Sequence, residues 1–86
     1  MLVYGFGADV IEEPVGEIHV WFDKWNDNVW YTTLYNKAGD TIGESASSHR
    51  KTWAKNEADA MAESLRRAEH SDPTIKVFTR DGVYNG

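Results

Sequence analysis

The feature that most constrains the fold is an aromatic ribbon, residues 18–35, which predicts one β-hairpin. It holds three of the four tryptophans in the 86-residue chain. Along residues 18–22 the side chains alternate, with Ile18, Val20 and Phe22 on one side and His19 and Trp21 on the other. Residues 28–35 are rich in β-branched and aromatic side chains, which favour strands. A small domain needs only one face of such a hairpin for its core, so the other face would present rings to water.

The connection between the two strands is the polar stretch 23–27. We expect Phe22 to pair with Asn28 across it, which places Val20 opposite Trp30. A slip of one residue would turn Trp30 away from the core, so the apolar pattern opposes it.

Three further elements follow the hairpin. Residues 41–46 read as a third strand, with Leu34 paired to Ile42. Apolar residues at spacings of three and four from Ala54 to Ala68 predict an amphipathic helix, with Asn56 as its N-cap. Residues 74–80 read as a last strand, 83–86 as a brief return along an edge, and 1–16 as either an edge strand or a loosely held arm.

The predicted fold class is therefore α+β, in the order β-β-β-α-β. One helix packs on one face of an antiparallel sheet of four to five strands. The predicted core is listed here: Ile18, Val20, Phe22, Trp30, Leu34, Ile42, Ala58, Met61, Ala62, Leu65, Ile75 and Val77.

The tryptophan strand with Trp30 and Leu34, the turn at Gly39, the strand at Ile42, the alanine-rich helix and the closing strand 75–77 resemble the YegP-like small bacterial domains. The resemblance covers residues 18–80. The N-terminal segment and the longer connection 45–55 depart from that pattern. The resemblance implies a fold and pairing of units, and it implies no activity.

Composition limits the class of protein. A chain of this length makes one domain, residues 1–86. Its net charge of −5 opposes non-specific nucleic-acid binding and favours a protein partner with a basic surface. The apolar runs are too short to span a membrane, and the N-terminus lacks the pattern of a signal peptide. With no cysteine in the sequence, we expect a cytoplasmic protein.

No motif indicates catalysis or a cofactor. Ser47, Ser48 and His49 are adjacent, but neighbouring residues rarely give triad geometry, and the G-x-S-x-G elbow is absent. His19, His49 and His70 are too widely spaced to predict a metal site. We therefore expect no enzyme activity, no metal and no cofactor.

The second face of the hairpin is the candidate binding surface, because exposed contiguous aromatic side chains mark contact sites. The candidate partner-binding residues are His19, Trp21, Trp25, Tyr31, Thr33 and Tyr35. Trp25 is predicted at the hairpin tip and the other five on the second face, together with Val29, Thr41 and Ser45. Three alternatives remain for this face: cover by residues 1–16 or 83–86, a homodimer through stacked faces, or another partner.

These observations predict a small acidic protein-binding module without enzyme activity. Its size and acidity are also similar to those of phage and mobile-element inhibitors of host nucleic-acid-handling complexes, the anti-CRISPR proteins among them. The alternative function is a single-stranded nucleic-acid-binding domain that uses the same sheet aromatics, because bases stack on exposed rings.

Overall fold

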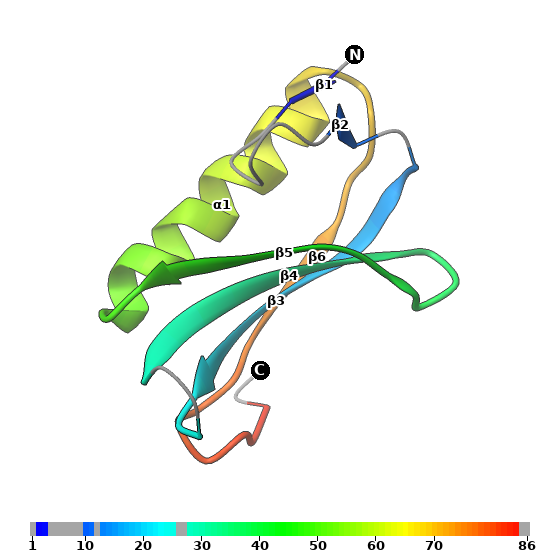
Figure 1. Cartoon of the computed structure of the whole chain (residues 1–86). Coiled ribbons are helices and arrows are strands. Elements are labelled where there is room, and N and C mark those ends of the chain that lie inside the picture. The colour runs from blue at the N-terminus through cyan, green and yellow to red at the C-terminus, as the bar shows by residue number, and fades with distance from the viewer. Residues whose placement is uncertain (1, 4–9, 12, 26–27, 85–86) are drawn as a thin grey trace.

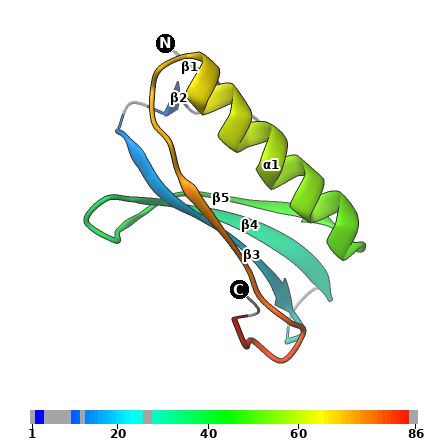
Figure 2. The same cartoon turned by 180° about the vertical axis from the view of Figure 1, so that it is seen from behind.

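A computed structural model describes residues 2–3, 10–11, 13–25 and 28–84. The elements are β1 (Leu2–Val3), β2 (Val10–Ile11), β3 (Val15–Asp23), β4 (Val29–Asn36), β5 (Thr41–Ser48), α1 (Lys51–Arg67) and β6 (Thr74–Val77). Strands β5, β4, β3 and β6 form a four-stranded sheet in that order. Figures 1 and 2 show α1 crossing one face of this sheet. The predicted α+β fold with one helix on one face is confirmed.

The sheet is mixed, whereas the sequence suggested an antiparallel one. Strands β3, β4 and β5 are antiparallel neighbours, but β6 runs parallel to β3, with Ile18 opposite Ile75 and Val20 opposite Val77. The reason is the connection: α1 carries the chain from the end of β5 back along the sheet, so β6 starts at the same end as β3.

The hairpin register differs from the expected one by two residues. Phe22 lies opposite Trp30, and Val20 opposite Thr32. The turn accounts for the difference: Asn28 adopts a left-handed φ of 52°, and its N–H donates to the carbonyl of Asp23 at 2.8 Å. Asn28 therefore belongs to the turn. Because side chains alternate with period two, a two-residue shift leaves every side chain on its predicted face.

The pairing of β4 with β5 shifts register twice, between Trp30 and Tyr31 and between Leu34 and Tyr35. Leu34 lies opposite Gly43 rather than Ile42, because the register shifts between Leu34 and Tyr35. Ile42 still packs against the core. Ser45 lies opposite Thr32, on the helix side of the sheet, so its predicted place on the second face is wrong.

Helix α1 begins at Lys51, and its N-cap is Arg50 instead of the predicted Asn56. No side chain caps this end, which is why the sequence carries no clear start signal. Arg66 and Arg67 occupy the last turn, where the helix dipole favours cations.

The core lies between α1 and the sheet. All twelve predicted core residues are either buried or packed against the buried cluster. Val15 and Ala54 are also buried, as is Thr32, whose hydroxyl hydrogen-bonds that of Ser47 at 2.7 Å. Trp30 is the largest fully buried side chain.

The N-terminal segment forms a separate two-stranded sheet. Leu2–Val3, within the segment predicted as an edge strand or arm, pairs with Val10–Ile11 rather than with the four-stranded sheet. Of the rest of the predicted segment 1–16, Val15 and Gly16 belong to β3, and residues 1, 4–9 and 12 lie outside the described residues. Within the described part of the chain, no helix combines the length and apolar character needed to cross a membrane.

Candidate functional site

The candidate surface is the sheet face that α1 does not cover. Cross-strand pairing brings most of the predicted binding residues together there. Trp21 lies opposite Tyr31, His19 opposite Thr33, and Glu17 opposite Tyr35. Strand β5 adds Ala46 beside Tyr31 and Glu44 beside Thr33. We call this surface the aromatic face.

A stacked ring pair occupies the centre of the aromatic face. The Trp21 and Tyr31 rings lie 5.0 Å apart at 18°. The Trp21 indole N–H donates to Thr33 Oγ1 at 2.8 Å, and the Thr33 hydroxyl donates to Glu44 at 3.3 Å. Thr33 is only 2% exposed. Its role in the structure is to hold the indole in place, while the two half-buried rings supply the accessible area.

A second cluster surrounds His19. Its ring lies 4.4 Å from that of Tyr35 and 5.3 Å from that of Phe78. His19 Nε2 donates to Glu17 at 2.8 Å, and Lys76 Nζ lies 3.2 Å from the other oxygen of the same carboxylate. These hydrogen bonds, that of His19 first, hold the pKa of the Glu17 carboxyl below its ordinary value. The ionised Glu17 carboxylate is thus stabilised by its two partners, His19 and Lys76.

Tyr84 in the C-terminal segment packs beside Phe78 of this second cluster. Phe78 bridges to Tyr84 as an isolated β-bridge, and their rings lie 5.8 Å apart. Lys76 Nζ lies 5.6 Å from the Tyr84 ring. Within the segment 83–86, Tyr84 thus lies beside Phe78 and Lys76 at the β6 side of the sheet, Val83 is exposed, and residues 85–86 lie outside the described residues.

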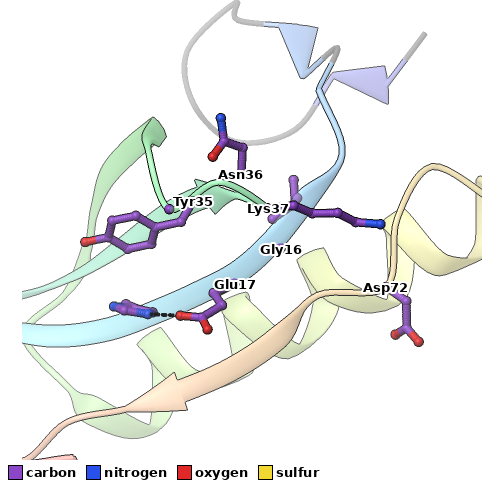
Figure 3. A pocket seen from close by; sticks show the side chains of 9 residues that line it. Gly16, Glu17, Tyr35, Asn36, Lys37 and Asp72 are labelled. Carbon is purple, nitrogen blue, oxygen red and sulfur yellow. Dashed lines mark hydrogen bonds and ion pairs between the residues drawn. The ribbon is translucent and has the colours of Figure 1, made fainter.

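An open cleft of about 480 Å³ adjoins the aromatic face at His19 and Tyr35. Gly16, at the bulge between Val15 and Glu17, lines the cleft, and a Cβ there would meet the carbonyl oxygen of Asn36 at 2.9 Å. Figure 3 shows Glu17 and Tyr35 at one side of the cleft and Asp72 at the other. Sequence reasoning missed this cleft because its residues come from three separate segments.

The three histidines lie at separate places in the described part of the chain. Within the described ranges, no group of three His, Cys, Asp or Glu side chains could hold a metal ion. His49 faces the Asn28 carbonyl, and His70 faces the Ser71 hydroxyl. The Ser48 hydroxyl accepts the Arg50 N–H at 3.0 Å. The three histidines and the serine pair therefore have separate structural contacts.

Two tryptophans stand apart from the aromatic face. Trp25 is 85% exposed in the turn after β3, and Lys24 Nζ lies 5.5 Å from its ring. Trp53 is 60% exposed in the first turn of α1, with the Arg50 guanidinium 5.1 Å from its ring. Sequence reasoning missed Trp53, because it falls in the predicted connection 45–55 and was assigned to no element.

Comparisons of the chain with protein-family models, with curated proteins and with solved structures found no match. The resemblance to YegP-like domains therefore stays a prediction.

Proposed function

We propose that this protein is a non-enzymatic protein-binding module whose contact surface is the aromatic face. The observation that carries the proposal is the Trp21–Tyr31 stack, which lies on the sheet face opposite α1. Tryptophan and tyrosine give large contact area at low entropy cost, and they are enriched at interaction hot spots.

The rigidity of this surface supports the same function. The indole of Trp21 is held by Thr33, and Thr33 in turn by Glu44. Rings fixed before binding lose little side-chain entropy when a partner docks. Glu44 is exposed beside the stack, and together with the net charge of −5 it favours a partner with a basic surface.

Nucleic-acid binding by this face is the weaker candidate. Lys76, which lies beside the His19 cluster, pairs with Glu17 at 3.2 Å. Single-strand binding through stacked bases also requires cations that follow the phosphates, so the rings of the aromatic face fit a protein better.

The narrower form of the proposal is an inhibitor from a phage or mobile element, such as an anti-CRISPR protein, acting on a host nucleic-acid-handling complex in the cytoplasm. It rests on small size and acidity, and it specifies a partner that is itself basic because it handles nucleic acid. The same geometry also allows a second copy of the chain to bind, forming a homodimer through two aromatic faces.

The test is a substitution that obstructs the aromatic face sterically without removing an existing side-chain contact. Ala46 is exposed opposite Tyr31, so Ala46→Arg places a long cation beside the ring stack. Ala60→Arg makes the same change on the exposed side of α1 and is the matched control. Each protein is used as bait in the same host extract, and its mass in solution is measured by light scattering.

We expect a captured protein that is retained by wild type and by Ala60→Arg and is lost with Ala46→Arg. A Trp21→Ala and Tyr31→Ala double variant should lose it too while keeping the helical circular-dichroism signal. A dimer that dissociates only with Ala46→Arg would assign the face to self-association. Equal capture by all four proteins would reject the aromatic face as the binding surface.

A further inference from the structure

Eight of the nine lysines and arginines of this acidic chain fall into two groups, and the ninth, Lys37, lines the cleft described above. Lys55, Arg66, Arg67 and Lys76 each form an ion pair with a carboxylate. Lys24, Arg50, Lys51 and Arg80 each lie over an aromatic ring instead, at 4.7–5.7 Å from its centroid. Among the described residues, no carboxylate lies within ion-pair distance of these four.

The four cations without carboxylate partners gather at one end of the molecule. Arg80 lies over Phe22 and Lys51 over Trp30, and the Phe22 and Trp30 rings are themselves 5.3 Å apart. Lys24 and Trp25 follow β3 directly, and Arg50 lies just before Lys51. Figures 1 and 2 show the β3–β4 turn, the start of α1 and the loop after β6 at this end.

We call this surface the basic end; it consists of Lys24, Trp25, Arg50, Lys51, Trp53 and Arg80. It carries the two most exposed tryptophans of the described chain, at 85% and 60%. His49 borders it through a contact with the Asn28 carbonyl. The nearby Asp23 carboxylate accepts the Trp25 backbone N–H at 3.0 Å, so it is already occupied in part.

We propose that the basic end binds single-stranded nucleic acid. Cations without carboxylate partners provide sites for phosphates, and each of the two exposed indoles has a cation at its side, which suits a base stacked beside its own phosphate. An acidic peptide would satisfy the cations but would leave the flat faces of both indoles without a planar partner. The proposal is independent of the aromatic face, which lies on the other side of the sheet from the Trp30–Lys51 contact.

The overall charge sets the strength of this binding. With a net charge of −5, long-range electrostatics oppose the approach of a polyanion, so the interaction should be weak and strongly dependent on salt. Four phosphate contacts to a single strand predict a slope of about −3 in a plot of log affinity against log salt concentration.

The experiment titrates a fluorescently labelled oligothymidylate with the full chain at low salt, following anisotropy and tryptophan fluorescence together. The test variant is Arg50→Gln with Lys51→Gln. The control is Arg66→Gln with Arg67→Gln, which makes the same change in net charge at the other end of α1. Trp53→Ala is measured separately, since its exposed side chain can be removed without opening the core.

We expect binding with tryptophan quenching, a slope about 1.4 shallower in the Arg50/Lys51 variant, and a loss of about fivefold or more with Trp53→Ala. The Arg66/Arg67 variant should bind as wild type does. No quenching at low salt, or an equal loss in both double variants, would overturn the proposal. It would also be overturned if a polyglutamate peptide of equal charge displaced the oligonucleotide as well as unlabelled oligothymidylate does.

Discussion

The indole N–H of Trp21 donates a 2.8 Å hydrogen bond to Thr33 Oγ1 across the β3–β4 pair. This bond ties a half-buried ring of the aromatic face to a threonine that is almost fully buried. Because the Thr33 hydroxyl also donates to Glu44, this one side chain connects residues of β3, β4 and β5 on the aromatic face. The orientation of the Trp21–Tyr31 stack thus depends on a residue that no partner can touch.

Thr33→Val should therefore destabilise the fold by about 1 kcal/mol, because it keeps the shape of the side chain and removes both hydrogen bonds. For a domain of this size that corresponds to a fall in melting temperature of roughly 4–8 °C. Thr41→Val, at an exposed position on the same face, is the control and should melt as wild type does. An unchanged melting temperature for Thr33→Val would mean that stacking on Tyr31 alone holds the indole.

The lowered pKa of the Glu17 carboxyl makes the stability of the fold depend on pH. Its hydrogen bonds from His19 and Lys76 lower its pKa in the folded protein below 4.5, the ordinary value. A carboxyl whose pKa is lowered by folding binds fewer protons when folded, so its contribution is fully present above pH 4.5 and is lost as the pH falls through the folded pKa.

Glu17→Gln should accordingly flatten the acid side of the stability curve, measured by urea unfolding at a series of pH values. His19→Gln should have a smaller effect in the same direction, because the Lys76 contact remains. An acid limb that is as steep in Glu17→Gln as in wild type would contradict the assignment.

Gly16 occupies a bulge where no side chain fits. A Cβ there would come within 2.9 Å of the Asn36 carbonyl oxygen and 3.0 Å of the Lys37 Cα, both of them backbone atoms. Gly16→Ala should cost about 1–3 kcal/mol, the usual range for overpacking, and it should widen the cleft beside Glu17. Thermal unfolding measures the cost. A Gly16→Ala protein as stable as wild type would show that the β4–β5 turn yields easily.

The sequence predicted the two faces of the hairpin but not its register. Faces depend on alternation alone, which survives the two-residue shift from Phe22–Asn28 to Phe22–Trp30. The register depends on the turn, where the left-handed conformation of Asn28 decides which residue first joins β4. Ser45 was misplaced for a related reason, because a bulge in β5 moves side chains between faces and leaves no compositional signal.

Two further differences arise from tertiary structure. Ile75 and Val77 fit an edge strand of either direction, and only the path of α1 makes β6 parallel to β3. The start of α1 lacks a capping side chain, so Trp53 and its contact with Arg50 were hidden in a predicted loop. The basic end combines residues from the turn, the helix start and the loop after β6, which only folding brings together.

The four tryptophans should separate into those needed for folding and those free for binding. Trp30 is 2% exposed and sits at the centre of the core, whereas Trp25 and Trp53 are 85% and 60% exposed. Trp30→Ala should cost about 3–5 kcal/mol, a large part of the roughly 4–13 kcal/mol expected for a domain of this length. Trp25→Ala and Trp53→Ala should each stay within about 0.5 kcal/mol of wild type.

Chemical unfolding measures the free energy of unfolding of all three variants. Acrylamide quenching of tryptophan fluorescence should fall in Trp25→Ala and in Trp53→Ala, because each variant lacks one accessible indole. A large loss of stability in Trp53→Ala would place that side chain in the fold and remove it from the basic end.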